Sequence, residues 1–241
     1  MVNTMLVVLP TYNERPNIEA VINGVLKHPF TRLLVVDDAS PDGTGKIADE
    51  QTAKWDGRLT VMHRTGPRGL GRAYIDGLKH ALGTDADAMC QMDADLSHDP
   101  SYLPDMRAGL DRYDLVIGSR YMNGVSVVNW PLRRIFLSAF ANRYIRAITG
   151  LSPHDCTGAF RAWRREALAR MPLDSARTGG YAFLTEMLYE AGRRGLRIGE
   201  VPIIFVERRE GASKVSSSIL MESLLTPWRL ILRSGRLTRP T

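Results

Sequence analysis

Five short runs of apolar residues recur in the first half of the chain, and each is followed by a polar loop. They cover residues 5–9, 33–36, 59–62, 88–92 and 115–118. Runs of this length, bounded by turn residues, are typical of buried strands. Segments with helical character separate them, near residues 16–26, 44–54, 72–82 and 100–110. This alternation predicts an α/β, Rossmann-like fold, with a mostly parallel central sheet flanked by helices on both faces.

The loops that follow these strands are rich in polar and charged residues. Ligands of such sheets bind beyond the carboxyl ends of the strands, so chemistry is expected there. The residues concerned are Tyr12, Glu14, Asp37, Asp38, Gly69, Gly71, Asp93, Asp95 and Arg120. Their expected convergence indicates one binding site at one edge of the sheet.

Asp93 and Asp95 directly follow the fourth apolar run. If the extended backbone continues, side chains two residues apart point the same way. Two carboxylates so close repel each other unless a cation lies between them, and oxygen-only ligands suit Mg²⁺ or Mn²⁺. The alternative is that both are turn residues after a strand, which is a frequent role of Asp. These two residues alone leave both interpretations open.

Gly69 and Gly71 precede a helical segment and form only a fragment of the dinucleotide-binding glycine motif. That motif belongs in the first strand–helix turn. Here the first turn, residues 10–16, contains no glycine, and no P-loop motif occurs in the chain. A dinucleotide site and a P-loop site are therefore disfavoured.

The composition narrows the class of protein further. The chain has 241 residues, 44% of them hydrophobic, which is ample for a large core. Its two cysteines lack metal-ligand spacing, which argues against a zinc site and fits a reducing cytoplasm. We detect no cleavable signal, and no apolar run approaches the roughly 18 residues typical of a membrane span.

The net charge of +6 favours an anionic partner, such as a phosphorylated small molecule, a lipid surface or nucleic acid. Nucleic acid is disfavoured because the basic residues, mainly in the second half, lack interleaved aromatic platforms. Residues 133–149 are amphipathic and basic. Residues 216–241 form an amphipathic basic C-terminal segment, in which Thr226 and Pro227 are expected to end one helix and begin another. This segment suits a membrane surface, a helix packed on the domain or a dimer contact.

Four motifs, in this order along the chain, resemble those of family 2 glycosyltransferases of the GT-A fold. They are PTYNE at residues 10–14, VDD at 36–38, GLG at 69–71 and DAD at 93–95. Three further segments narrow the resemblance to polyprenol-phosphate (dolichyl-phosphate) mannose synthases: QMDADLSHDP at 91–100, GSRY at 118–121 and ERREGASK at 207–214. The likeness extends from residue 6 to about residue 215.

The resemblance implies a role for particular residues on the donor side. Residues that line or close the nucleotide-sugar pocket would be Pro10, Tyr12, Glu14, Asp38, Gly69, Asp93, Arg209 and Lys214. The acidic pair Asp93 and Asp95 would hold Mg²⁺ or Mn²⁺ against the diphosphate, with Ser97 at the third ligand position.

On the acceptor side, the resemblance implies that Arg120, Arg134 and Ser138 bind the lipid phosphate. Asp93, Asp95, Arg120 and Arg134 would then be the catalytic residues. The implied catalytic domain covers residues 1–215, with a nucleotide-sugar half of about 1–120 and an acceptor half of about 121–215.

The implied reaction transfers mannose from GDP-mannose to a polyprenyl monophosphate with inversion, giving polyprenyl-phosphate β-mannose. The alternatives are a polyprenyl-phosphate glycosyltransferase that uses a UDP-sugar such as UDP-glucose, and a non-catalytic nucleotide-sugar-binding or scaffold protein. The implied location is peripheral, on the cytosolic face of a membrane. Attachment would come from a membrane-anchoring partner protein, a fused region or the amphipathic C-terminal segment.

Overall fold

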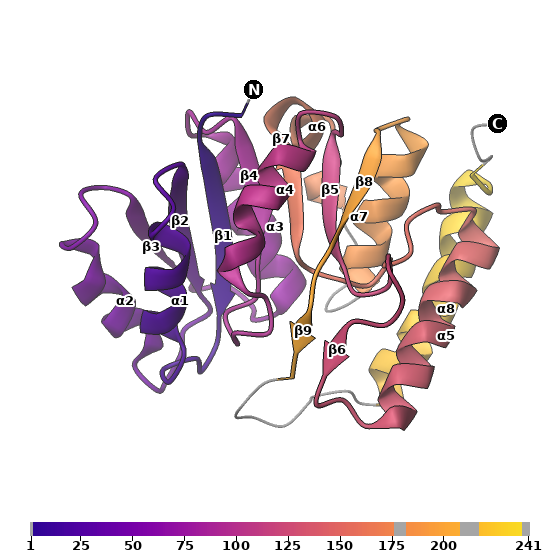
Figure 1. Ribbon diagram of the computed structural model, residues 1–241, viewed down its shortest axis with the longest axis horizontal. Coiled ribbons are helices and arrows are strands. Elements are labelled where there is room, and N and C mark those ends of the chain that lie inside the picture. The colour runs from indigo at the N-terminus through magenta and orange to yellow at the C-terminus, as the bar shows by residue number, and fades with distance from the viewer. Residues whose placement is uncertain (1, 176–181, 208–216, 238–241) are drawn as a thin grey trace.

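A computed structural model of the chain describes residues 2–175, 182–207 and 217–237, except for the side chains of 175, 217–220 and 223. Seven strands form one sheet in the order β3-β2-β1-β4-β7-β5-β8 (Figure 1). Their bounds are Met5–Thr11 (β1), Thr31–Asp37 (β2), Leu59–His63 (β3), Ala88–Gln91 (β4), Leu115–Ser119 (β5), Arg161–Arg164 (β7) and Ile198–Pro202 (β8). A separate parallel pair joins β6 (Val127–Val128) to β9 (Phe205–Val206).

The strand directions confirm the predicted mostly parallel sheet. β1 pairs in parallel with β2 and β4, and β5 pairs in parallel with β8. Only β7 runs against its neighbours, β4 and β5. Because β7 is inserted between β4 and β5, those two strands still point in the same direction.

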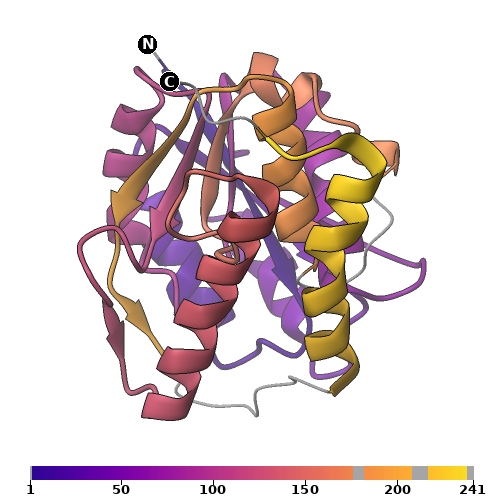
Figure 2. The ribbon, with the colours of Figure 1, turned by 90° about the vertical axis from the view of Figure 1, so that its right-hand side faces the viewer.

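Helices cover both faces of the sheet (Figures 1 and 2). The α-helices are α1 (Ile18–Leu26), α2 (Thr44–Thr52), α3 (Leu70–Leu82), α4 (Leu103–Gly109), α5 (Leu132–Thr149), α6 (Arg165–Ala169), α7 (Ala182–Arg193) and α8 (Ser217–Ser234). Short 3₁₀ turns occupy Pro100–Tyr102 (η1) and Leu173–Ser175 (η2).

Alternating residues of β1 enter two different cores, as the two-residue period of a strand requires. Leu6 and Val8 belong to the core that contains residues of α3 and α7, whereas Val7 and Leu9 belong to the core with residues of α1 and α4. α3 approaches the sheet closely at Gly77, where a Cβ atom would lie 2.4 Å from Val8 Cγ1. The central strand β1 is therefore buried on both faces of the sheet, which explains its unbroken apolar run.

α5 and α8 pack against each other beside the sheet (Figure 2). The hydroxyl of Tyr144 in α5 donates to the carbonyl of Leu224 at 3.0 Å and accepts from Nε1 of Trp228 at 2.8 Å. The apolar residues of α5 do not share one buried face: Phe136 is 71% exposed, whereas Ile145 is buried. Both helices thus leave large apolar side chains in contact with solvent.

The predicted helix break at Thr226 and Pro227 is wrong, because α8 continues through both residues. A helical proline removes its own N–H donor. Here the packing of α8 against α5 and α7 compensates for that missing bond, and the Thr226 hydroxyl donates to the carbonyl of Glu222 at 2.7 Å. None of the helices in the described ranges is both long enough and apolar enough to cross a bilayer.

Candidate active site

The sheet brings the candidate residues of four loops to one edge. The chain leaves β1, β2, β4 and β5 in the same direction, because these strands are mutually parallel. Tyr12 follows β1, Asp38 follows β2, Asp93 follows β4 and Arg120 follows β5. These loops meet at the carboxyl edge, where open α/β sheets bind their ligands.

Asp38 joins the end of β2 to the loop before α3. It is buried and forms an ion pair with Arg64 through Oδ1, while its Oδ2 accepts from the backbone N–H of Gly69 at 2.8 Å. Arg64 also donates from Nε to Asp76 at 2.8 Å. Gly69 has a φ of +147°, a backbone conformation that a side chain disfavours. Asp38 therefore fixes the shape of the glycine loop.

Arg68, in the same loop, covers the ring of Tyr12. Its guanidinium carbon lies 4.8 Å from the ring centre, and Nη1 donates to the phenol oxygen at 2.9 Å. Its Nη2 donates to the carbonyl of Ala39 at 3.3 Å. The pair combines an aromatic face with a positive charge beside the end of β1.

Glu14 and Pro10 shape the first loop. The Glu14 backbone N–H donates to Oγ1 of Thr44 at 2.9 Å, and its carboxylate accepts from Asn17 at 2.9 Å. Pro10 is the penultimate residue of β1, is buried and pairs in register with Val36. These contacts dock the loop after β1 onto the start of α1 and α2.

Both carboxylates of the acidic pair are held by hydroxyl groups. Tyr74 in α3 donates to Oδ1 of Asp93 at 2.6 Å. The backbone N–H of Ser97 donates to Oδ1 of Asp95 at 3.1 Å, and the Ser97 hydroxyl donates to the same oxygen. Burial and the neighbouring Asp93 charge raise the pKa of Tyr74 well above its ordinary value, so Tyr74 remains a donor.

His98 holds the backbone of this pair. Its Nδ1 accepts from the backbone N–H of Asp93 at 3.0 Å, and its ring stacks on Phe160 at 5.1 Å between centroids. Burial lowers the pKa of His98, against the opposing effect of Asp93 and Asp95. An accepting Nδ1 and a lowered pKa both describe a neutral imidazole.

The side chains of Asp93, Asp95 and Ser97 carry only oxygen atoms, the ligand type that a hard divalent cation prefers. No cluster of three or more His, Cys, Asp or Glu side chains that could hold a metal occurs in the described ranges. Two carboxylates and a hydroxyl leave coordination positions for phosphate oxygens and water, as is usual for Mg²⁺. The chemistry of these side chains is therefore compatible with Mg²⁺ or Mn²⁺.

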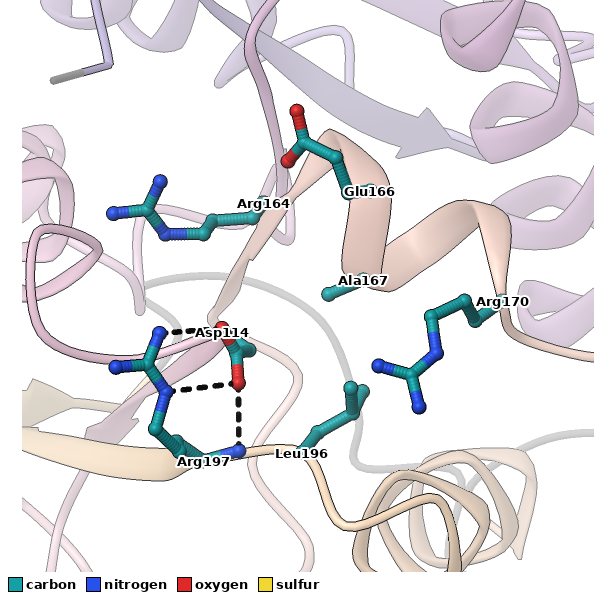
Figure 3. A pocket seen from close by; sticks show the side chains of 7 residues that line it. All are labelled: Asp114, Arg164, Glu166, Ala167, Arg170, Leu196 and Arg197. Carbon is teal, nitrogen blue, oxygen red and sulfur yellow. Dashed lines mark hydrogen bonds and ion pairs between the residues drawn. The ribbon is translucent and has the colours of Figure 1, made fainter.

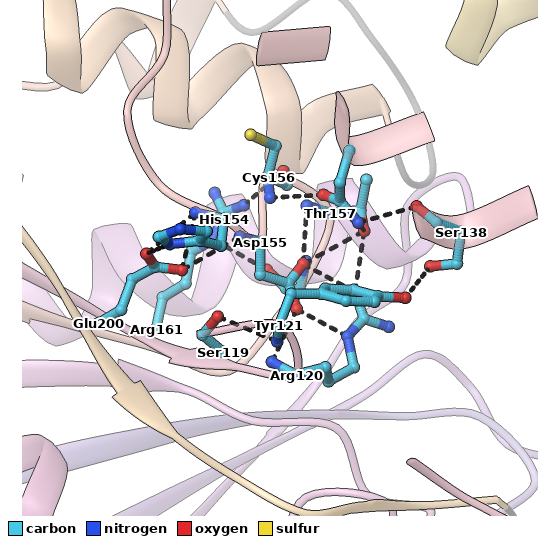
Figure 4. A network of polar contacts seen from close by, with 12 residues as sticks. Ser119, Arg120, Tyr121, Ser138, His154, Asp155, Cys156, Thr157, Arg161 and Glu200 are labelled. Atoms are coloured by element: carbon cyan, nitrogen blue, oxygen red, sulfur yellow. Dashed lines mark hydrogen bonds and ion pairs between the residues drawn. The ribbon is translucent and has the colours of Figure 1, made fainter. Parts of the chain in front are cut away.

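Arg120 is fixed by a buried carboxylate that the sequence analysis did not identify (Figure 4). Its Nε donates to Oδ2 of Asp155 at 2.7 Å and its Nη2 to Oδ1 at 2.8 Å. Nη2 also donates to Thr157 at 2.8 Å, whereas Nη1 makes no hydrogen bond to the described residues. Among its guanidinium nitrogens, Nη1 is therefore the one that can still donate to a ligand.

Asp155 is completely buried and also accepts from the backbone N–H groups of Thr157 at 3.2 Å and Gly158 at 2.9 Å. Burial by itself raises the pKa of Asp155, but the Arg120 charge and these hydrogen bonds outweigh it, and the net pKa is lowered. For Arg120, burial acts to lower the pKa, and Asp155 reverses this to a net rise. Both groups are consequently charged at neutral pH.

Arg134 lies in the first turn of α5 and has different partners. Its guanidinium carbon is 4.1 Å from the ring centre of Trp130, and Nη1 forms an ion pair with Glu207. One turn later, Ser138 accepts from the Tyr121 hydroxyl at 2.6 Å. The Ser138 hydroxyl can still donate its own hydrogen to a ligand.

Arg209 and Lys214, predicted to close over a nucleotide sugar, lie outside the described residues. Sequence reasoning also missed residues that hold the candidate side chains in place, among them Arg68, Tyr74, Trp130 and Asp155. Arg68 could have been found from its position inside the glycine loop. Tyr74 and Asp155 carry no local signal, because their partners are 19 and 35 positions away along the chain. Trp130 is only four positions from Arg134, but no motif in the sequence marks it.

The structure also has a cavity of about 350 Å³ at the opposite edge of the sheet (Figure 3). It is lined by Asp114, Arg164, Glu166, Ala167, Arg170, Leu196 and Arg197. Asp114 and Arg197 neutralise each other through two side-chain contacts, the shorter at 2.9 Å. The cavity is remote from the acidic pair and contains none of the candidate residues.

Comparison with known proteins gives a consistent result. Residues 6–171 match the model of the family described as glycosyl transferase family 2. The chain is 43% identical over 237 residues to the polyprenol monophosphomannose synthase of Mycolicibacterium smegmatis, a match that covers 97% of this chain and 89% of that protein. It is 42% identical over 233 residues to the undecaprenyl-phosphate mannosyltransferase of Micrococcus luteus, with 95% of each chain covered.

Solved structures of the glucosyl-3-phosphoglycerate synthase of Mycobacterium tuberculosis share the fold. One contains Mn²⁺, UDP and glucosyl-3-phosphoglycerate and superposes with a TM-score of 0.68 at 21% identity, covering 98% of this chain and 82% of the other. A second, with Mn²⁺, UDP and phosphoglyceric acid, gives a TM-score of 0.69 at 20% identity, covering 98% and 80%. At this level of identity the likeness concerns the fold.

Proposed function

Because this chain belongs to glycosyl transferase family 2, we propose that it transfers mannose from GDP-mannose to the phosphate of a polyprenyl monophosphate. The product would be polyprenyl-phosphate β-mannose, formed with inversion at the sugar. The observation that carries this proposal is the similarity, over nearly the whole chain, to two proteins named for mannosyl transfer to polyprenyl phosphates.

We propose that the donor side of the site is built by residues 1–120. Tyr12, Glu14, Asp38 and Gly69 lie at the carboxyl edge of the sheet, with Pro10 beneath them. Arg68 adds a cation stacked on Tyr12, which suits an anionic nucleotide. We also propose Arg209 and Lys214 as residues that close over the nucleotide sugar, although both lie outside the described residues.

Asp93, Asp95 and Ser97 would hold Mg²⁺ or Mn²⁺ beside the donor diphosphate. When bound, such a cation stabilises the negative charge of the departing nucleotide. The chain itself prepares this corner of the site. Tyr74 and Ser97 orient the two carboxylates, and His98 accepts the backbone N–H of Asp93. Positions set in advance in this way avoid reorganisation during the reaction.

On the acceptor side, Arg120, Arg134 and Ser138 would bind the lipid phosphate. A phosphate monoester has its second pKa near 6, so its attacking oxygen is already anionic at neutral pH and needs no general base. The role of the arginines is then to bring this anion next to a negatively charged donor through charge-assisted hydrogen bonds. These residues belong to the acceptor half, about residues 121–215, together with Arg120 at its border.

We propose that the protein acts at the cytosolic surface of a membrane, where its lipid acceptor resides. Leu132, Phe136 and Phe140 of α5 and Trp228 and Leu232 of α8 are all exposed. Exposed apolar groups next to basic residues suit the interface of an anionic bilayer. Flotation with phosphatidylglycerol vesicles tests this: Phe136→Asp should leave more protein unbound than the parent, and equal flotation would point to an anchoring partner protein instead.

The direct test of the reaction uses radiolabelled GDP-mannose, Mg²⁺ and a polyprenyl phosphate, followed by extraction into organic solvent. We expect labelled lipid with the parent protein and at least about a hundredfold less with Asp95→Asn, since loss of a key electrostatic contact has effects of this size. UDP-glucose in place of GDP-mannose should give little product. A preference for UDP-glucose, or full activity of Asp95→Asn in a folded state, contradicts the proposal.

A further inference from the structure

Trp130 lies where the two proposed acceptor arginines meet. It precedes α5, and its ring centre is 4.1 Å from the guanidinium carbon of Arg134 and 5.7 Å from that of Arg120. Phe205 of β9 meets the same ring edge-on, at 5.5 Å between centroids. One indole thus contacts cations from the loop after β5 and from the first turn of α5.

The two arginines are fixed in different ways. The guanidinium group of Arg120 donates to the carboxylate of Asp155 through Nε and Nη2, and these two bonds lie in the guanidinium plane. The side chains of Arg134 and its carboxylate partner, Glu207, are both about a third exposed, at 34% and 29%. Such a half-exposed ion pair contributes little to holding a side chain in place. The ring of Trp130 is the remaining described partner that restrains Arg134.

Stacking restrains a guanidinium group without using its donors. The N–H groups of arginine lie in the guanidinium plane, and an aromatic ring contacts the face of that plane. A carboxylate instead occupies the N–H groups and offsets the charge that a phosphate would require. Trp130 can therefore orient Arg134 without occupying any of its N–H donors.

The indole N–H gives a second, independent indication. Nε1 of Trp130 is buried and has no hydrogen-bond partner among the described residues. A buried donor without a partner destabilises a fold and requires an explanation. Phenylalanine would fill much of this space without that cost. The larger π-surface of indole, which binds cations more strongly than phenylalanine, accounts for tryptophan here.

We propose that Trp130 is a positioning residue for the acceptor phosphate, acting through Arg134 and more weakly through Arg120. This inference rests on the proposed function, because it concerns the phosphate-binding side of that reaction. It assigns Trp130 no contact with the donor. Its removal therefore raises the KM for the polyprenyl phosphate and leaves the KM for GDP-mannose unchanged.

The experiment compares Trp130→Leu, which removes the π-face, with Trp130→Phe, which keeps a smaller one. We expect acceptor KM to rise about fivefold to thirtyfold in Trp130→Leu, the change that corresponds to losing a desolvated cation–π contact. Trp130→Phe should give an intermediate KM and a thermal stability equal to or above that of the parent. If Trp130→Leu does not fold, Trp130→Met replaces it with an apolar side chain that adapts to the space.

Trp55 supplies a matched control. It also has a buried, unpaired Nε1 and lies under an arginine, Arg58, at 5.9 Å, but it is in the segment before β3 and away from the carboxyl edge. Trp55→Leu should leave both KM values unchanged. An unchanged acceptor KM in Trp130→Leu, or a rise equal to that in Trp55→Leu, overturns the role of Trp130. Absence of mannosyl transfer and of polyprenyl-phosphate binding by the parent protein instead overturns the proposed function.

Discussion

Replacing Asp155 with asparagine should strongly destabilise the protein. Asp155 is completely buried and supplies the counter-charge for Arg120, which is 8% exposed. Removing one partner of a buried ion pair typically costs about 3–5 kcal/mol, because the other charge stays buried without compensation. In a chain of this length each kcal/mol lowers Tm by about 2–4 °C. We therefore expect Tm to fall by about 6–20 °C in Asp155→Asn.

The assay is urea denaturation followed by circular dichroism, together with a thermal melt. Asp114→Asn is the matched control, because Asp114 also binds an arginine in two places, but that arginine, Arg197, is 63% exposed. Exposed pairs contribute about 0–1 kcal/mol. The double variant Arg120→Met with Asp155→Leu should regain part of the stability that Asp155→Asn loses, since no unpaired charge remains. Equal losses in Asp155→Asn and Asp114→Asn would refute this reasoning.

Three further outcomes follow from the described packing and burial. The Cys90 and Cys156 thiols should resist alkylation at pH 8 until the protein is unfolded in urea. Burial raises the pKa of both thiols, that of Cys156 to about 12. Fast labelling of the native protein in a mass-spectrometric time course would contradict this. Gly77→Ala should destabilise the protein by about 1–3 kcal/mol in urea titrations, because the new methyl group would overlap Val8, and a neutral effect would mean that α3 shifts freely. Because the pKa of Asp155 is lowered in the folded state, its contribution to stability is complete above the unfolded pKa near 3.9 and is lost as pH falls through the lower folded pKa. Asp155→Asn should therefore reduce the fall in unfolding free energy below about pH 4. An unchanged pH profile of stability would argue against the lowered pKa.

The sequence was sufficient to predict the architecture because strand period and burial act locally. Runs such as residues 5–9 are apolar at every position, which is the pattern of a strand covered on both faces. Five such runs with helices between them specify parallel crossovers, and these bring the loops to one edge. The antiparallel direction of β7 depends on the path of the chain through residues 120–160, which no local pattern encodes.

At Pro227, a local rule gave a wrong prediction. Proline disfavours the interior of a helix, and this predicted a break that the structure does not have. Contacts of α8 with α5 and α7 hold the helix continuous, and such contacts are invisible to a propensity argument. The stabilisation from tertiary packing here exceeds the cost of a proline inside a helix, which is about 3 kcal/mol.

The candidate site divides in the same way. Asp93, Asp95 and Arg120 follow strands directly, so topology alone indicated their region. The partner of Asp95, Ser97, is local, but the side-chain partners of Asp93 and Arg120 could not be found, because only the fold brings them close. Tyr74 reaches Asp93 from α3, and Asp155 reaches Arg120 from a turn 35 positions later.

The two arginines that we propose for the acceptor side, Arg120 and Arg134, also differ in their electrostatic surroundings. Arg120 and Asp155 together carry almost no net charge, so this pair mainly supplies a rigid donor in a fixed place. Arg134 is balanced by Glu207, a carboxylate that is partly in water and can therefore be solvated if a stronger anion takes its place. A phosphate carrying nearly two negative charges is such an anion, and two donors in one plane can bind it in a bidentate manner. If the proposed function is correct, the attraction for the acceptor phosphate depends on Arg134 being both accessible and oriented. The ring of Trp130 can orient the guanidinium group without neutralising its charge.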